Sequence, residues 1–211
     1  MTKLALLGAE STGKTALAMG IAAHWRAQGH PVHAVGEYLR EWCDREGRTP
    51  HPHEQPGIAQ EQARRALQVP PGHWLVADTT PLMTAIYSAM LFDDASLYDF
   101  ALQHQRHYDL TLVTGLDLPW VADGLQRDGP HVREPVDALV RAALDRAGVP
   151  YRVVYGQGPQ RLANALFAME ALKRSGTETR PWTCEKCADP DCEHRLFTGL
   201  LASRAADPPA T

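Results

Sequence analysis

The stretch GAESTGKT, residues 8–15, follows the apolar run KLALL at 3–7 and leads into a helical pattern that begins near residue 14. Gly8 and Gly13 stand five positions apart and Lys14 and Thr15 follow, which is the Walker A spacing. In such a loop backbone N–H groups face a phosphate, the lysine reaches the β- and γ-phosphates, and the hydroxyl binds Mg²⁺. We therefore predict a site for ATP and Mg²⁺ made by seven residues: Gly8, Glu10, Ser11, Thr12, Gly13, Lys14 and Thr15.

Short β-rich runs alternate with helical patterns along the chain, and this alternation is typical of βαβ units and a parallel sheet. Helical patterns are bounded by Gly29, Gly148 and Gly176, where C-terminal caps are expected. The sequence thus predicts an α/β fold with five strands, at 3–7, 31–35, 73–78, 110–115 and 151–156, and helices near 14–28, 134–147 and 158–176.

The composition indicates a globular protein, with 44% apolar and 22% charged residues and a net charge of −4. This negative charge argues against sequence-independent binding of nucleic acid. No apolar run approaches the roughly 20 residues of a membrane span, and the first strand begins too early for a signal peptide. We expect a cytoplasmic protein that binds neither nucleic acid nor a membrane.

Acidic side chains follow the second and third predicted strands. Glu37 and Arg40 come after the second strand, and Asp78 ends the third. Because ligands of an open α/β sheet bind beyond the carboxyl ends of its strands, these residues are expected to face the same crevice as Lys14. A carboxylate there can hold Mg²⁺, accept the proton of an attacking hydroxyl or bind a sugar diol, and Asp78 could alternatively cap the next helix.

Two further segments complete the predicted site. The long segment after the fourth strand contains Arg127 and Arg133, which suit a closing segment that stabilises a transferred phosphoryl group. The fifth strand is followed by GQGPQR, whose Gln157 and Arg161 are candidates for contact with the nucleotide base. Lys14, Asp78, Arg127 and Arg133 are therefore the predicted catalytic residues. Asp78 is expected to position or deprotonate the attacking hydroxyl, and Lys14 and the two arginines to stabilise the transferred phosphoryl group.

These motifs together resemble the ribosylnicotinamide kinase domain of bacterial NAD-salvage proteins of the NadR type. The resemblance covers residues 1 to about 175, in order. It implies a P-loop NTPase fold like that of nucleoside monophosphate kinases, and transfer of the γ-phosphoryl of ATP to the 5′-hydroxyl of nicotinamide riboside. An AAA-type ATPase description is compatible with the same residues. Carried over by position, the acceptor would be bound by six residues: Glu37, Tyr38, Arg40, Asp78, Trp120 and Asp123.

The sequence departs from this family pattern at three positions, Gly36, Thr80 and Gln126. Gly36 replaces a tryptophan that is a candidate to stack on the nicotinamide ring. Aromatic residues elsewhere, namely Tyr38, Trp42 or Tyr87, could replace it, because a cationic ring is attracted to aromatic faces. Another small hydroxyl substrate is the alternative.

The last segment, 177–211, contains CEKCADPDCEH and is separate in character from the domain at 1–176. Three thiols and an imidazole are ligands that suit structural zinc. We predict a small zinc-binding element formed by Cys184, Cys187, Cys192 and His194, with reduced thiols or a redox-sensing cluster as the alternatives. The final residues, ADPPAT, are expected to be frayed.

Three functions are compatible with these residues. The leading one is a small-molecule kinase, with nicotinamide riboside or another nucleoside or nucleotide as acceptor. The second is a regulatory ATPase whose tail binds a protein partner or a second copy of the chain. A nucleic-acid module built on the tail ranks last, because its only basic stretch is KRSGTETRPW.

Overall fold

The computed structural model describes residues 1–122 and 129–175 of the protein. Its five strands are β1 (Lys3–Leu7), β2 (Val32–Val35), β3 (Trp74–Asp78), β4 (Leu110–Thr114) and β5 (Arg152–Val154). Its helices are α1 (Lys14–Ala27), α2 (Tyr38–Glu46), α3 (Gln55–Leu67), α4 (Pro81–Phe92), α5 (Tyr98–Gln105), α6 (Arg133–Arg146) and α7 (Gly158–Ser175), with short 3₁₀ turns η1 (Pro52–Glu54) and η3 (Pro130–Val132).

The strands form one parallel sheet in the order β2-β3-β1-β4-β5. In its centre Leu6 pairs with Asp78 and Leu7 with Val113, so the carboxyl ends of β3, β1 and β4 lie at one edge. The central strands are covered on both faces, which explains why they are continuous apolar runs. The predicted five-stranded parallel sheet is therefore confirmed.

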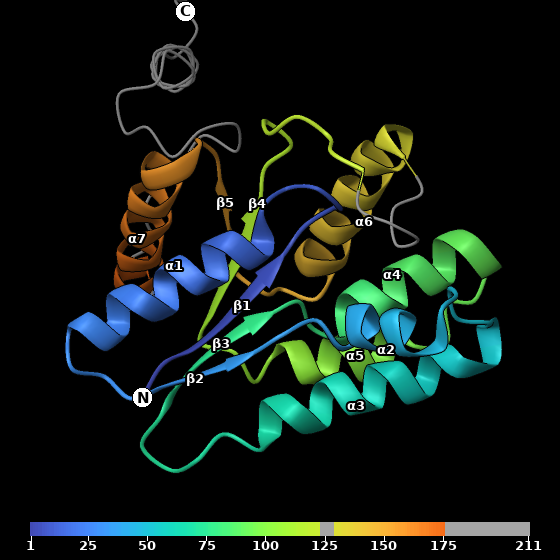
Figure 1. The fold of residues 1–211 in the computed structure, drawn as a ribbon, viewed down its shortest axis with the longest axis horizontal. Helices are drawn as coiled ribbons and strands as arrows, with labels where there is room; N and C mark the ends of the chain where they lie inside the picture. Colours follow the sequence, from blue (N-terminus) through green and yellow to red (C-terminus); the bar gives the residue numbers. More distant parts are fainter. Residues whose placement is uncertain (123–128, 176–211) are drawn as a thin grey trace, which may run out of the picture.

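Helices cover the two faces of the sheet in separate layers (Figure 1). Leu4 and Leu6 pack with α1 and α7 on one face, whereas Leu7 and Val113 pack with α3, α4, α5 and α6 on the other. The smaller cluster of Trp42, Cys43 and Ile58 joins α2 to α3. No helix in the described ranges is long and apolar enough to cross a membrane.

The predicted strands and the three predicted helices differ from the observed ones by at most two residues at either end. Helices α2, α3, α4 and α5 were not delimited from the sequence. The boundary at residue 176 and the predicted zinc ligands Cys184, Cys187, Cys192 and His194 lie outside the described residues. Within the described part of the chain, no group of three or more His, Cys, Asp or Glu side chains could hold a metal ion.

Candidate active site

The loop between β1 and α1 has the backbone that its glycines predict. Gly8 has φ of 141°, and a Cβ at this position would collide with the Thr114 side chain, so the loop passes directly over the end of β4. Gly13 has φ of 74°, and a Cβ there would lie 2.9 Å from Leu118. Even Ser11 has a positive φ of 55°. The loop thus has the conformation expected of a Walker A loop, and only glycine fits at positions 8 and 13.

Buried side chains hold this loop from beneath. The hydroxyl of Thr12 donates to the carbonyl of Ala9 at 2.7 Å and lies 2.6 Å from the hydroxyl of Thr114. Arg161, from α7, is 4% exposed and donates to the Thr12 carbonyl at 2.8 Å and to the Gly156 carbonyl at 2.7 Å. The loop is therefore fixed to β4 and α7 before any nucleotide binds, an arrangement that lowers the entropic cost of binding.

Lys14, Thr15 and Asp78 meet at the end of β3. The Lys14 ammonium donates to the Ala9 carbonyl at 2.8 Å, within the loop itself. The Thr15 hydroxyl donates to one carboxylate oxygen of Asp78 at 2.5 Å, while the other, Oδ1, is buried and has no hydrogen-bond partner among the described residues. Asp78 does not cap α4, because the Thr80 side chain accepts the hydrogen bond from Leu82 N–H. A buried carboxylate with one unsatisfied oxygen beside a hydroxyl fits a divalent cation.

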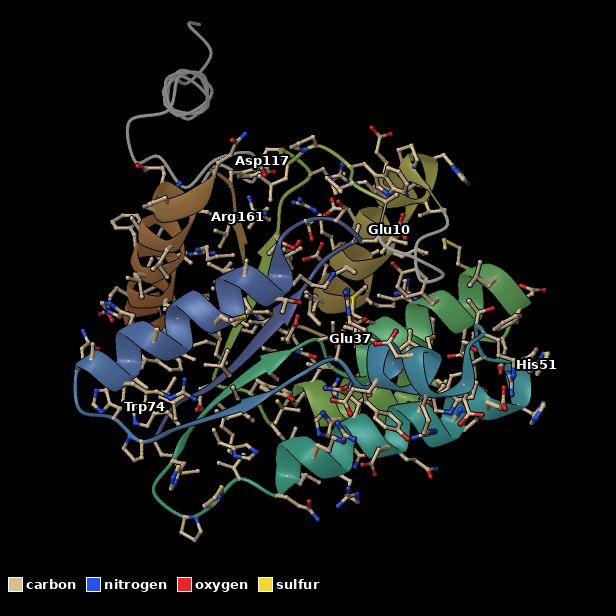
Figure 2. The ribbon with its side chains drawn as sticks, in the orientation of Figure 1. Glu10, Glu37, His51, Trp74, Asp117 and Arg161 are labelled. Atoms are coloured by element: carbon tan, nitrogen blue, oxygen red, sulfur yellow. The ribbon has the colours of Figure 1, made fainter. Side chains whose placement is uncertain are left out.

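Glu37 lies beyond the end of β2, near the centre of the view in Figure 2 and in the same part of the fold as Glu10. It occupies the N-cap position of α2 without making a capping bond, so its carboxylate is directed to other partners. Arg40 is 3.7 Å away in an ion pair. Burial raises the pKa of Glu37 above its ordinary value of 4.5, and the nearby Asp78 raises it further, whereas Lys14 and Arg40 lower it. A carboxyl group with a raised pKa suits proton transfer at neutral pH.

The raised pKa of Glu37 leads to a prediction about how the stability of the protein depends on pH. The folded protein holds the Glu37 proton more tightly than the unfolded chain, so ionisation opposes folding as pH rises above 4.5 and through the folded pKa. We expect Glu37→Gln to melt at a higher temperature than the wild type at pH 7, with a smaller difference at pH 4, and to lose about a hundredfold or more in turnover. Melting curves and initial rates measure the two effects. A variant that is less stable at pH 7 and still fully active would contradict both.

A residue that sequence analysis missed, Gln62, holds the ends of β2 and β3 together. It is 3% exposed, accepts from the Tyr38 N–H at 2.7 Å, and donates to the carbonyls of Gly36 at 3.2 Å and Thr79 at 3.4 Å. These bonds bracket Glu37 on both sides. The available signal was a glutamine on the buried stripe of α3, which also contains Ile58, Ala59, Ala63 and Ala66.

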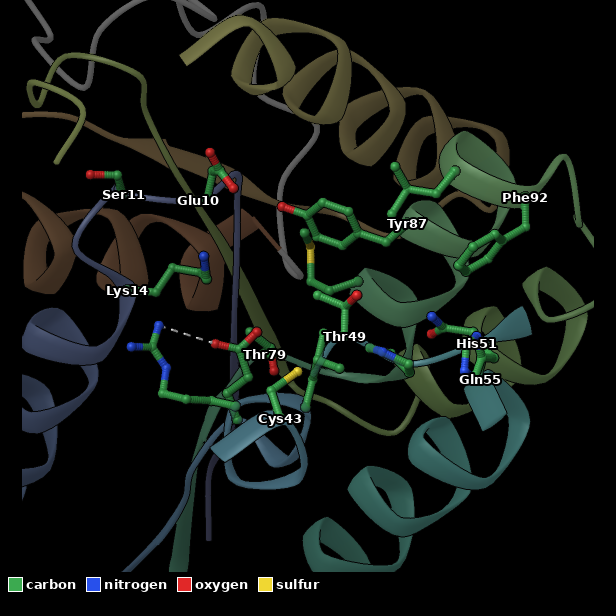
Figure 3. A pocket seen from close by; sticks show the side chains of 16 residues that line it. Glu10, Ser11, Lys14, Cys43, Thr49, His51, Gln55, Thr79, Tyr87 and Phe92 are labelled. Atoms are coloured by element: carbon green, nitrogen blue, oxygen red, sulfur yellow. Dashed lines mark ion pairs between the residues drawn. The ribbon is translucent and has the colours of Figure 1, made fainter. Parts of the chain in front are cut away.

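A pocket of about 400 Å³ opens from the phosphate loop and extends between α2 and α4 (Figure 3). Glu10, Ser11 and Lys14 lie at one end, and His51, Gln55 and Phe92 lie at the other. Such a volume is in the range of small-molecule sites. The pocket joins two predicted halves, the ATP loop and the strand-end residues Glu37 and Arg40. Its remaining lining residues are Leu39, Cys43, Thr49, Pro50, Thr79, Met83, Tyr87 and Leu91.

Of the three aromatic residues considered as ring-stacking partners, only Tyr87 lines this pocket. The Arg65 guanidinium covers the Tyr38 ring at 4.4 Å, and the Arg48 guanidinium covers the Trp42 ring at 4.9 Å. Trp42 is also buried, at 8% exposure. The geometry therefore favours Tyr87 as the aromatic wall of the pocket.

Four of the predicted site residues lie between β4 and β5, and the structure places only two of them, Trp120 and Arg133. Asp123 and Arg127 lie outside the described residues. Trp120 donates through its indole N–H to Glu10 at 2.8 Å, so it contacts the phosphate loop but does not itself line the pocket. Arg133 is 8% exposed and donates to the carbonyls of Leu116 at 3.1 Å and Leu118 at 2.8 Å. This favours a positioning role for Arg133 over the predicted contact with a phosphoryl group.

The two residues predicted to contact the nucleotide base differ in placement. Gln157 is exposed, just before α7. Arg161 forms an ion pair with Asp117 at 3.0 Å in addition to its main-chain bonds, and Figure 2 shows the two residues near each other. Its guanidinium therefore supports the loop from within, which favours an indirect contribution to ATP binding over contact with the base.

We predict a large effect of removing this support. Arg161→Met removes the donor to the buried Thr12 carbonyl and to the partly buried Gly156 carbonyl. We therefore expect the unfolding free energy to fall by about 2–4 kcal/mol and ATP affinity to fall about tenfold. Denaturant unfolding and nucleotide titration measure these effects. The control is Arg64→Met, which breaks an exposed pair with Glu61 on α3 and should cost at most about 1 kcal/mol. Equal effects of the two substitutions would contradict the role of Arg161.

Comparison with known proteins agrees with this geometry. A family model described as an AAA domain matches residues 3–161, more than half of the chain and all of the loop and strand-end residues above. The chain belongs to this AAA-domain family. No curated protein matches the sequence significantly.

Two solved structures share the fold of this AAA domain. They are a NadR protein in complex with NAD and AMP-PNP, with a TM-score of 0.62, and a NadR protein in complex with NR, with a TM-score of 0.61. Each is 16% identical, and each match covers 87% of this chain and 52% of the other. The chain thus spans about half the length of these proteins. The resemblance to the NadR type is confirmed at the level of the fold.

Proposed function

We propose that the protein is an ATP- and Mg²⁺-dependent kinase that transfers the γ-phosphoryl group to the 5′-hydroxyl of a nucleoside, with nicotinamide riboside as the leading acceptor. The observation that carries this proposal is the pocket that opens directly from Lys14 and contains Glu37 and Arg40. A regulatory ATPase needs no second cavity of nucleoside size beside its phosphate loop. The NadR structures, with AMP-PNP in one and NR in the other, support the choice of both substrates.

The phosphate loop and Asp78 would bind ATP and Mg²⁺. Lys14 and the loop N–H groups bind the phosphates of ATP and stabilise the charge on the transferring group. Thr15 and Asp78 are the residues that would hold Mg²⁺, which supplies charge neutralisation at the phosphate oxygens when it is bound. This assignment for Asp78 follows from its bond to Thr15 and its unsatisfied oxygen.

Glu37 is then the carboxylate available to the acceptor. The acceptor hydroxyl oxygen forms the new bond to the γ-phosphorus while the bond between that phosphorus and the β–γ bridging oxygen breaks. The hydroxyl proton passes to a carboxylate oxygen of Glu37. Arg40, paired with Glu37 at 3.7 Å, keeps this carboxylate oriented at the mouth of the pocket.

Product analysis with matched acceptors tests the proposal. A panel of nucleosides that includes nicotinamide riboside is incubated with ATP and Mg²⁺, and 5′-monophosphates are identified by mass spectrometry. We expect one or more monophosphates to form and the matching 5′-deoxynucleoside to inhibit without being phosphorylated. Phosphorylation of a 5′-deoxynucleoside at another hydroxyl, or no monophosphate from any acceptor, contradicts the proposed transfer.

A further inference from the structure

Gln55, the first residue of α3, lies at the end of the pocket opposite the phosphate loop (Figure 3). Its side chain is buried, with 3% of the residue exposed. Its carbonyl oxygen, Oε1, has no hydrogen-bond partner among the described residues. The distal end of the pocket therefore contains a buried polar group that is unsatisfied in the absence of a ligand.

A second glutamine on the same helix face shows how unusual this is. Gln62, about two turns further along α3, is equally buried, and both ends of its amide are bonded to the main chain. Buried side-chain polar atoms in proteins nearly always have a partner. Of two glutamines on one buried stripe, the one without a partner for its carbonyl is the one that lines the pocket.

The main chain before Gln55 is held firmly in place. Arg48 makes a two-pronged ion pair with Glu54, with both N–O distances at 2.7 Å, and stacks on the Trp42 ring. Glu54 also accepts the His51 N–H at 2.7 Å. These contacts fix the turn that leads into α3, so the position of Gln55 is set before an acceptor arrives, as a specificity-determining residue requires.

The surroundings of Gln55 suit a flat ring. Met83, Tyr87, Leu91 and Phe92, all from α4, supply apolar and aromatic surface along the pocket. An acceptor whose 5′-hydroxyl lies near Lys14 and Glu37 would place its base or ring at the other end, beside Gln55. An orphan carbonyl oxygen in that place requires a hydrogen-bond donor.

On the basis of the proposed function, we propose that Gln55 Oε1 accepts a hydrogen bond from an exocyclic N–H group on the ring of the acceptor. Gln55 is then a specificity-determining residue that favours a ring carrying an amide or amino group over one carrying a carboxylate or carbonyl at the same position. A carboxylate or carbonyl oxygen facing the Gln55 amide oxygen would leave both oxygens without a hydrogen-bond donor, and such a mismatch is costly in a buried site.

Matched acceptor pairs test this inference. The pairs are nicotinamide riboside with nicotinic acid riboside, and cytidine with uridine; in each pair one member has an exocyclic N–H donor where the other has an oxygen. For the wild type, Gln55→Glu and Gln55→Met, kcat and KM are measured for each pair, and nucleoside binding is measured in the presence of AMP-PNP. The control is Gln60→Met, on the exposed side of α3, which should leave the ratio within each pair unchanged.

We expect the wild type to prefer the donor-bearing member of at least one pair by tenfold or more, and Gln55→Met to reduce that preference about tenfold, mainly by raising KM. Gln55→Glu keeps an acceptor and should keep the preference. Gln55→Met should melt no lower than the wild type, because it removes an unsatisfied polar atom. An unchanged preference in Gln55→Met, or a wild type that turns over both members equally, overturns the role of Gln55 and leaves the kinase proposal intact. A wild type that neither binds nor phosphorylates any acceptor overturns the proposed function and this inference with it.

Discussion

Lys14→Ala is expected to abolish phosphoryl transfer, with kcat at least about a thousandfold below that of the wild type. Lys14 is the one cation of the Walker A loop, and its ammonium is close enough to the pocket to contact a transferring phosphoryl group. Removing a preorganised charge from such a site costs two to three orders of magnitude or more. Coupled assays of ADP formation measure the loss, and circular dichroism with a melting curve shows whether the fold is retained.

Lys3→Ala is the matched control, because Lys3 begins β1 at the opposite end of that strand. Its rate should stay within about twofold of the wild type. Lys14 belongs to none of the hydrophobic clusters of the described residues, and its ammonium bonds to the loop carbonyl of Ala9, so we expect the melting temperature of Lys14→Ala to change by only a few degrees. Residual turnover within tenfold of the wild type would contradict the assignment of the loop as the donor site.

Asp78→Asn is expected to separate ATP binding from transfer. The amide can still accept from the Thr15 hydroxyl, so the loop geometry is kept, but the negative charge that would hold Mg²⁺ is lost. We expect the dissociation constant of ATP without Mg²⁺ to stay within a few-fold and kcat with Mg²⁺ to fall about a thousandfold. Nucleotide titration and initial-rate measurements over a range of Mg²⁺ concentrations distinguish the two effects.

The same chemical change at Asp109 provides the control. Asp109 is exposed, precedes β4 and accepts the Lys3 main-chain N–H at 2.8 Å, at the opposite end of the sheet. Asp109→Asn should leave the dependence of the rate on Mg²⁺ unchanged. If Asp78→Asn retains transfer and the wild-type response to Mg²⁺, Asp78 is not part of the catalytic site.

The phosphate loop and the strand-end acids could be predicted because each depends on local sequence. Gly8 has φ of 141° where the loop passes close to the end of β4, and a side chain would not fit there. The first glycine of the Walker A pattern meets this requirement. Asp78 was predicted because a polar residue ended a buried apolar run, and parallel strands bring such ends to one edge. The fold and the conformation of the phosphate loop could therefore be predicted largely from single motifs.

The remaining parts depend on contacts between residues far apart in the chain. Arg161 reaches the Thr12 carbonyl across 149 positions, and no local pattern distinguishes it from a surface arginine near the start of a helix. Tyr38, Trp42 and Tyr87 are indistinguishable as candidate aromatic walls until the positions of Arg48 and Arg65 are known. The two buried glutamines of α3, Gln55 and Gln62, likewise differ only in what surrounds them.

We propose that the phosphate loop and the adjoining pocket form the two halves of one phosphoryl-transfer site. The most direct test of this proposal is the rate of ADP formation from ATP and Mg²⁺ with and without nicotinamide riboside and the other nucleosides of the panel. We expect ADP formation to depend on an acceptor, with one molecule of nucleoside monophosphate formed per molecule of ADP. ADP formation at the same rate with and without every acceptor would contradict this proposal.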